Sequence, residues 1–208
     1  MRYTIANQHI NYYLEHGFIE FEEIIDQNLL EEAKDKLPKI IDTTNPNSIY
    51  RTGRDLFRND FLFQKISKNS NLAHIAKDLT GAKYLQLAFD QVYSSNKIFK
   101  ESGSFEEYFS FQDLKCIAMI RLDHSTTLEY SENFQAPMQF ANVVFVNPHR
   151  TFDLSSLQKE KQCLFFIGYA SDRTVYKCNQ NDLNNSNLKR FGYCFGDRLQ
   201  EEHHPIVS

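Results

Sequence analysis

The sequence has no tryptophan, no long apolar run and no cluster of basic residues. The run from Cys163 to Ile167 is far shorter than the roughly 20 apolar residues that a membrane helix needs. Basic runs stop at two residues, as in Lys189-Arg190, and the net charge is −4. The first eight residues lack the apolar stretch of a secretory signal. We therefore expect no membrane span, no nucleic-acid partner and no secretory signal.

Cysteine is also scarce, and its spacing excludes a disulfide framework. The four cysteines are Cys116, Cys163, Cys178 and Cys194, with no C-x-x-C pair among them. Three of them lie inside apolar or alternating runs, where a buried free thiol is the ordinary outcome. This usage favours a reducing, cytoplasmic compartment.

The residues that are abundant indicate a globular chain rich in strands. Apolar residues make up 41% and charged residues 24%, and there are 18 phenylalanines and 11 tyrosines. The first third nevertheless predicts helices. One ends at Gly17, a second begins after Asp26 and ends near Pro38, and a third lies between Asn69 and Gly81.

The pattern changes after Lys83 to short apolar runs bounded by polar segments. Such spacing predicts a sandwich or barrel. The expected strands cover residues 84–93, 116–122, 142–146, 163–169 and 190–195, with polar loops at 42–60 and 96–108. No linker composition interrupts the chain. We expect one domain over 1–208, in which a helical layer (about 1–82) packs on a barrel (about 83–198) that ends in a short C-terminal tail.

The order of these short signals resembles the phytanoyl-CoA dioxygenase family of iron- and 2-oxoglutarate-dependent oxygenases. The matching segments are Tyr12 to Phe21, Leu72 to Tyr93, Phe111-Gln112-Asp113-Leu114, Val143 to Arg150 and Lys189 to Tyr193. The resemblance implies a mainly β fold with N-terminal helices, an α+β double-stranded β-helix of the jelly-roll type. This agrees with the strands expected from the pattern alone.

The resemblance also implies where a metal site would be. The family holds Fe(II) with two histidines and one carboxylate, which leaves open positions for 2-oxoglutarate and oxygen. Of these ligand positions only Asp113 is retained, because Phe111 and Thr174 occupy the two histidine positions. Arg190 matches the arginine that would bind the distal carboxylate of 2-oxoglutarate.

The missing histidines do not depend on how the sequence is aligned. None of the seven histidines has an acidic residue two positions later, and none lies between His149 and His203. The tail histidines, His203 and His204, lie in a segment of the kind that is more often disordered than functional.

Three hypotheses follow. The first is a barrel that has lost its metal chemistry and binds a small molecule or a protein partner, with no cofactor expected. The second is an active oxygenase that needs Fe(II) and 2-oxoglutarate and uses unusual ligands such as Asp113, His149 or the tail histidines. The third is a β-sandwich interaction module that matches the family by chance. Aromatic residues of the 96–109 loop (Phe99, Phe105, Tyr108 and Phe109) would suit an apolar ligand or would simply pack.

Overall fold

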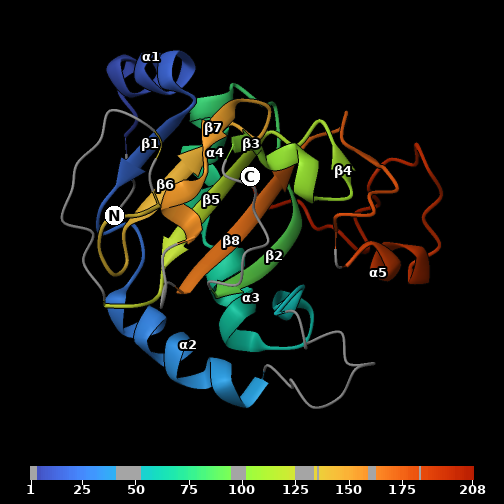
Figure 1. The fold of residues 1–208 in the computed structure, drawn as a ribbon, viewed down its shortest axis with the longest axis horizontal. Helices are drawn as coiled ribbons and strands as arrows, with labels where there is room; N and C mark the ends of the chain where they lie inside the picture. Colours follow the sequence, from blue (N-terminus) through green and yellow to red (C-terminus); the bar gives the residue numbers. More distant parts are fainter. Residues whose placement is uncertain are drawn as a thin grey trace.

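The computed structural model describes residues 4–40, 53–94, 102–124, 134, 136–158, 163–182 and 184–208. Figure 1 shows a sheet whose strands run side by side, with helices from the first third of the chain around it and a small C-terminal helical region at one side. No helix in the described part of the chain is long and apolar enough to cross a membrane.

The N-terminal helices form where the sequence predicts them. They are α1 (Asn7–His16), α2 (Gln27–Ile40), α3 (Phe61–Ser67) and α4 (Ser70–Thr80). The side chain of Asn69 accepts hydrogen bonds from two backbone N–H groups at the start of α4, and Gly81 ends that helix in the left-handed conformation. Gly17 ends α1 in the same way. Only the short α3 was not expected from the sequence.

The main sheet is antiparallel throughout and has the strand order β1-β6-β5-β8-β2. Its strands are β1 (Phe18–Phe21), β6 (Val143–Val146), β5 (Cys116–Arg121), β8 (Cys163–Ala170) and β2 (Gln86–Ser94). The expected strands at 84–93, 116–122, 142–146 and 163–169 are thus confirmed.

A second layer consists of two small antiparallel sheets. In one, β3 (Ser102–Ser104) pairs with β7 (Thr151–Asp153), and in the other, β4 (Phe111–Gln112) pairs with β9 (Val175–Tyr176). Short helices η3 (Phe105–Tyr108) and η4 (Ser155–Gln158) follow β3 and β7, whereas η2 (Leu56–Arg58) precedes α3 and α5 (Asn185–Arg190) follows β9.

The main sheet is buried on both faces, and strand alternation divides its side chains between two cores. In β5, Cys116 and Ala118 belong to the core shared with the helices, whereas Ile117 and Met119 belong to the core shared with the small sheets. The second core is rich in phenylalanine and forms the interior of the barrel. This is where the ligand positions of the resembled family are expected.

Two separate segments cover the outer edge of β2. Residues 53–55 pair with it, since the Val92 N–H donates to the Gly53 carbonyl at 2.9 Å. Further along, Leu199–Ser208, here called the C-terminal strap, pairs through Leu87 N–H to Pro205 O at 2.9 Å and Val207 N–H to Leu85 O at 2.8 Å. An otherwise open sheet edge is thereby satisfied within the chain.

Three expectations need correction. Residues 190–195 are not a strand, because α5 ends at Arg190 and turns follow in which Gly192 and Gly196 have φ of 84° and 88°. The segment 102–109 is not an open loop, because it holds β3 and η3 and its rings at Phe105, Tyr108 and Phe109 are buried. The tail is ordered and paired. Phe99 and most of the predicted 42–60 loop lie outside the described residues.

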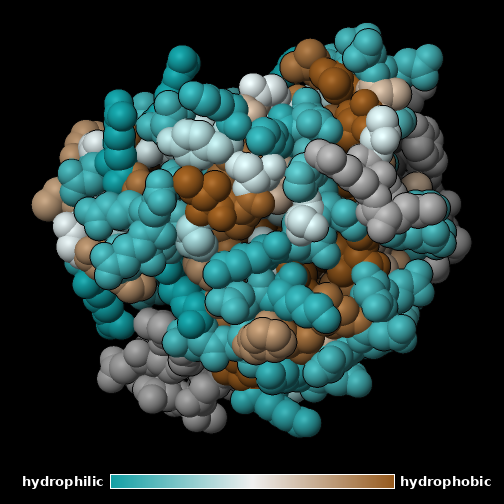
Figure 2. Space-filling view, turned by 180° about the vertical axis from the view of Figure 1, so that it is seen from behind, coloured by the Kyte–Doolittle hydropathy of each residue, from teal (hydrophilic) through white to brown (hydrophobic). Residues whose placement is uncertain are grey.

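The outer surface is mainly hydrophilic when the molecule is seen from behind, and the apolar residues there emerge in small areas separated by hydrophilic ones (Figure 2). Among the described residues, Phe61 at the start of α3 is the most exposed of the large apolar side chains, at 80%. Scattered exposure of this kind is usual for globular proteins.

Candidate functional site

The pairing of β4 with β9 brings together Asp113 and Thr174, two of the three positions that the resemblance assigns to metal ligands. Gln112 lies opposite Val175, so Asp113 and Thr174 follow and precede their strands at the same end of this small sheet. The Thr174 hydroxyl donates a hydrogen bond to the carbonyl oxygen of Asp113 at 2.8 Å. Phe111 begins β4, and Asp113 directly follows that strand. The structure thus brings Asp113 and Thr174 into contact, and a common metal site with Phe111 stays a prediction.

Phe111, which the resemblance assigns to the first histidine position, is part of a closed aromatic cluster. It is 1% exposed, and its ring stacks on Phe89 with centroids 5.6 Å apart. Phe109 covers Phe89 at 4.3 Å, and the His204 ring meets Phe111 edge-on at 6.0 Å. The guanidinium carbon of Arg54 lies 4.1 Å from the Phe89 centroid and 5.7 Å from that of Phe111. A fixed cation and packed rings thus occupy this part of the interior.

The other two positions are satisfied by the protein itself. Asp113 has a left-handed backbone, with φ of 63°, and its carboxylate forms an ion pair with Lys115 at 2.9 Å. Its backbone N–H donates to Glu106 at 2.9 Å. The Thr174 hydroxyl oxygen also accepts the backbone N–H of Ser171 at 2.9 Å. Both side chains therefore already interact with groups of the protein.

His149 adds an imidazole beside this carboxylate. Its Nδ1 lies 2.9 Å from Glu106 Oε2, and its Nε2 lies 3.7 Å from Asp113 Oδ1. Partial burial opposes ionisation of Glu106, but the Asp113 N–H and the His149 ring outweigh it and lower the pKa of this carboxyl. The cluster is a set of mutually paired charges at a partly exposed surface.

These residues do not fit the iron centre that the resemblance implies. A phenyl ring has no lone pair, a threonine hydroxyl committed to two backbone groups is a poor donor, and the carboxylate is paired with a lysine. Across the described residues, no group of three or more histidine, cysteine, aspartate or glutamate side chains is arranged to hold a metal ion.

Arg190, the expected 2-oxoglutarate ligand, is the last residue of α5 and is exposed. The expected strand start is wrong at this position, because the chain continues from the helix into a turn at Gly192. A role in binding an oxoacid stays a prediction for Arg190.

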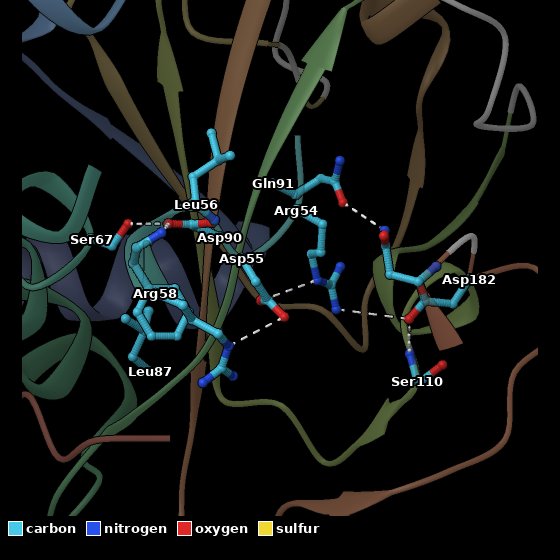
Figure 3. A network of polar contacts seen from close by, with 12 residues as sticks. Arg54, Asp55, Leu56, Arg58, Ser67, Leu87, Asp90, Gln91, Ser110 and Asp182 are labelled. Atoms are coloured by element: carbon cyan, nitrogen blue, oxygen red, sulfur yellow. Dashed lines mark hydrogen bonds and ion pairs between the residues drawn. The ribbon is translucent and has the colours of Figure 1, made fainter. Parts of the chain in front are cut away.

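The structure instead reveals a buried arginine that sequence reasoning missed. Arg54 is 2% exposed and lies between two carboxylates, Asp55 at 3.6 Å and Asp182 at 3.8 Å (Figure 3). Asp55 also faces Arg58 at 3.5 Å, and Asp182 accepts the Ser110 N–H at 2.7 Å. Burial raises the pKa of Asp55, although both arginines oppose this shift.

Asp90 on β2 anchors the start of η2 in the same network. One carboxylate oxygen accepts the Leu56 N–H at 2.6 Å, and the other accepts the Phe57 N–H at 2.9 Å and the Ser67 hydroxyl at 2.8 Å (Figure 3). Asp90 is fully buried, and burial together with nearby Asp55 raises its pKa to about 7. This carboxyl holds the Arg54 segment against the sheet.

One hint of this network in the sequence is the charged and apolar mixture Arg54-Asp55-Leu56-Phe57-Arg58, which lies in a segment expected to be a loop. Asp90 sits in an apolar run, where an acidic residue is expensive unless it is hydrogen-bonded. An acidic residue at this position was the signal from which a buried hydrogen-bonded network could have been predicted.

The C-terminal strap covers the aromatic centre from outside. His204 is fully buried, and its Nδ1 lies 3.2 Å from the Leu87 carbonyl oxygen. Arg58 donates to the His203 carbonyl, and the His204 ring packs on Tyr193 at 5.6 Å as well as on Phe111. The expectation of a disordered tail is therefore wrong, because its backbone completes the β2 edge.

Comparison with solved structures identifies the fold. SnoK, a non-heme α-ketoglutarate-dependent carbocyclase from nogalamycin biosynthesis, matches with a TM-score of 0.71 and 14% identity over 98% of this chain and 97% of its own. The epimerase SnoN of the same biosynthesis matches with a TM-score of 0.68 and 11% identity over 96% and 97% of the two chains. CT296 from Chlamydia trachomatis matches with a TM-score of 0.53 and 19% identity over 82% of this chain and 98% of its own.

No protein-family model and no curated protein sequence matches the chain. Identities this low establish the fold and leave the activity open. The expected α+β architecture with N-terminal helices is confirmed: the chain has the double-stranded β-helix fold of the Fe(II)- and 2-oxoglutarate-dependent oxygenases.

Proposed function

We propose that this chain is a binding protein on an oxygenase fold, in which protein contacts have replaced the metal centre. The observation that carries the proposal is Phe111. Its ring, at the position that the resemblance assigns to the first histidine, is buried among Phe89, His204 and the Arg54 guanidinium. Its partner is a small molecule or a protein, bound without metal chemistry.

The contacts around Asp113 and Thr174 support the same conclusion. Binding a metal there would require breaking the Lys115 ion pair, and the Thr174 hydroxyl would have to leave the Asp113 carbonyl. Each change removes an existing interaction in a partly or fully buried setting, so it opposes metal binding. The barrel keeps its architecture while its centre serves stability.

Thermal unfolding tests the proposal. Metal-stripped protein is heated with and without Fe(II) or Mn(II), each with and without 2-oxoglutarate, and SnoK serves as a positive control. A ligand at 100 times its Kd stabilises a protein by about 2.7 kcal/mol, which corresponds to roughly 5–10 °C for a chain of this size. We expect SnoK to shift and this chain to stay unchanged. A shift that needs metal and oxoacid together would overturn the proposal.

A second candidate is an oxygenase with unusual ligands, and the 3.7 Å approach of His149 to Asp113 favours it. It predicts consumption of 2-oxoglutarate that Asp113→Ala abolishes. The matched control is Asp172→Ala, which removes an exposed aspartate from the nearby turn before Thr174. Absence of oxoacid consumption under every metal tested would eliminate this candidate.

A further inference from the structure

The C-terminal strap closes the barrel interior through a small number of contacts. Its backbone pairs with the first residues of β2, and the Gln86 side-chain amide donates to the His204 carbonyl at 3.2 Å. Arg58 donates to the carbonyl of His203. Beneath these contacts the His204 ring rests on Phe111, which is the centre of the proposed binding function.

His204 is held in its neutral form by its surroundings. A carbonyl can only accept, so Nδ1 carries the hydrogen and donates it to Leu87. Nε2 is then a bare acceptor, buried and without a hydrogen-bond partner among the described residues. A proton on Nε2 would find no acceptor there. Burial, followed by the charge of Arg58, lowers the pKa of His204 to about 3.

The groups that face His204 add to this preference. Arg58 of η2 and the adjacent His203 both oppose a second positive charge, whereas only the backbone at Leu87 and Ala88 favours it. Tyr193 and Phe111 present rings, and the Tyr193 hydroxyl is already an acceptor for the Gln200 N–H at 2.8 Å. The Asp55 carboxylate pairs with Arg58 at 3.5 Å.

We propose that the strap Leu199–Ser208 is an acid-released closure, in which protonation of His204 frees the strap and uncovers the aromatic centre around Phe111. In the closed state a proton on Nε2 has no hydrogen-bond acceptor, and in the open state water solvates the charged imidazole. Acid therefore favours opening. The role of this opening in binding rests on the proposed function, but the opening itself needs no ligand and can be measured separately.

The direction and size follow from linkage. The closed state keeps His204 neutral, so its stability is full above the ordinary histidine pKa of about 6.5 and is lost as pH falls toward the lowered value of about 3. A pH of 5 lies about 1.5 units below the pKa of an exposed histidine. Protonation of His204 in the open state therefore raises the equilibrium constant for opening about 30-fold at pH 5 relative to pH 7.5.

Hydrogen exchange of the full chain, corrected for the intrinsic effect of pH, tests the proposal. We expect the amides that bond between β2 and the strap, those of Leu85, Leu87, Val207 and Ser208, to lose protection about 30-fold between pH 7.5 and pH 5, while β5 and β8 stay protected. In His204→Gln, which keeps a donor for Leu87 but cannot titrate in this range, the pH effect should vanish. The matched control His203→Gln removes the neighbouring imidazole, which stacks on Phe191, and should retain the effect.

Equal protection of the strap at both pH values in the wild-type chain would overturn the proposal. So would a pH effect that persists in His204→Gln or disappears in His203→Gln. If His204→Gln does not fold, the wild-type and His203→Gln measurements still decide. Strap opening without any partner binding would leave this inference standing and count against the proposed function instead.

Discussion

Replacing Asp90 gives the sharpest test of how the buried network supports the fold. Its carboxylate accepts three hydrogen bonds, from the N–H groups of Leu56 and Phe57 and from the Ser67 hydroxyl, with no exposure to solvent. Asp90→Ala leaves three buried donors without an acceptor. Each costs about 1–3 kcal/mol, not fully additively, so we expect a loss of about 3–5 kcal/mol in the free energy of unfolding. Asp90→Asn keeps the shape and loses only the Phe57 bond, because the Ser67 hydroxyl can reverse and accept.

The pH dependence separates Asp90 from a generic core position. Its pKa of about 7 exceeds the ordinary aspartate value of about 3.9, so the folded state binds the proton more tightly than the unfolded state. The stability that this group contributes is therefore full in acid and declines as pH rises through about 7. Between pH 5 and pH 8 the decline amounts to about 2–3 kcal/mol.

Urea unfolding followed by circular dichroism at pH 5, 6, 7 and 8 measures this contribution as the difference between wild type and Asp90→Asn. Titration of His204 is common to both proteins and cancels. We expect the substitution to be most costly at pH 5 and least costly at pH 8. A cost that stays constant over this range would refute the assignment of a raised pKa to Asp90.

Three further substitutions test the packing by the same unfolding assay. Gly168→Ala places its Cβ 2.2 Å from the Phe89 ring, which is itself backed by other rings, so we expect the free energy of unfolding to fall by about 1–3 kcal/mol. The control Gly103→Ala, whose nearest contact is at 3.5 Å, should change the free energy of unfolding by less than about 0.5 kcal/mol. Phe111→Ala should cost about 3–5 kcal/mol, and a neutral result would contradict the closed aromatic centre. Asp60→Ala removes the cap of α3, which accepts two backbone N–H groups, and should cost about 1–2 kcal/mol; unchanged stability would show that this cap is dispensable.

The parts of the fold that the sequence predicted are those with strong local patterns. The cap at Asn69 and the terminator at Gly81 define α4 within the chain itself. Strands β5 and β8 read as continuous apolar runs because both of their faces are buried. Local chemistry was sufficient in these places.

The parts that failed depend on contacts between distant segments. Arg54 is buried because carboxylates at Asp55 and Asp182 surround it, and Asp182 lies far along the chain. His204 is ordered because β2 offers an open edge to the strap. Neither relation leaves a periodic signal near the residue concerned, so a loop and a disordered tail were the natural expectations.

For the candidate site, the order of short segments could be predicted from the sequence, and the contacts from distant segments could not. Placing Phe111, Asp113 and Thr174 in one site depended only on the order of short segments, and the pairing of β4 with β9 brings Asp113 and Thr174 into contact. The cation over the aromatic rings could not be foreseen, since Arg54 comes from a distant segment, whereas Lys115, which pairs with the carboxylate, is only two residues from Asp113.

The contacts around Arg54 form one linked arrangement, and under the proposed function this bears on how the fold can lose a metal. A barrel centre that lacks its cation must still satisfy the groups that remain there. In this chain the Arg54 guanidinium supplies a positive charge inside, its own charge is balanced by Asp55 and Asp182, and Asp90 fixes the backbone that carries it. Because each contact depends on the next, the centre is stable as a whole. Under the proposed function, a histidine introduced at Phe111 would meet the Arg54 guanidinium where a metal ion would need room, so packing as well as the missing histidines opposes metal binding.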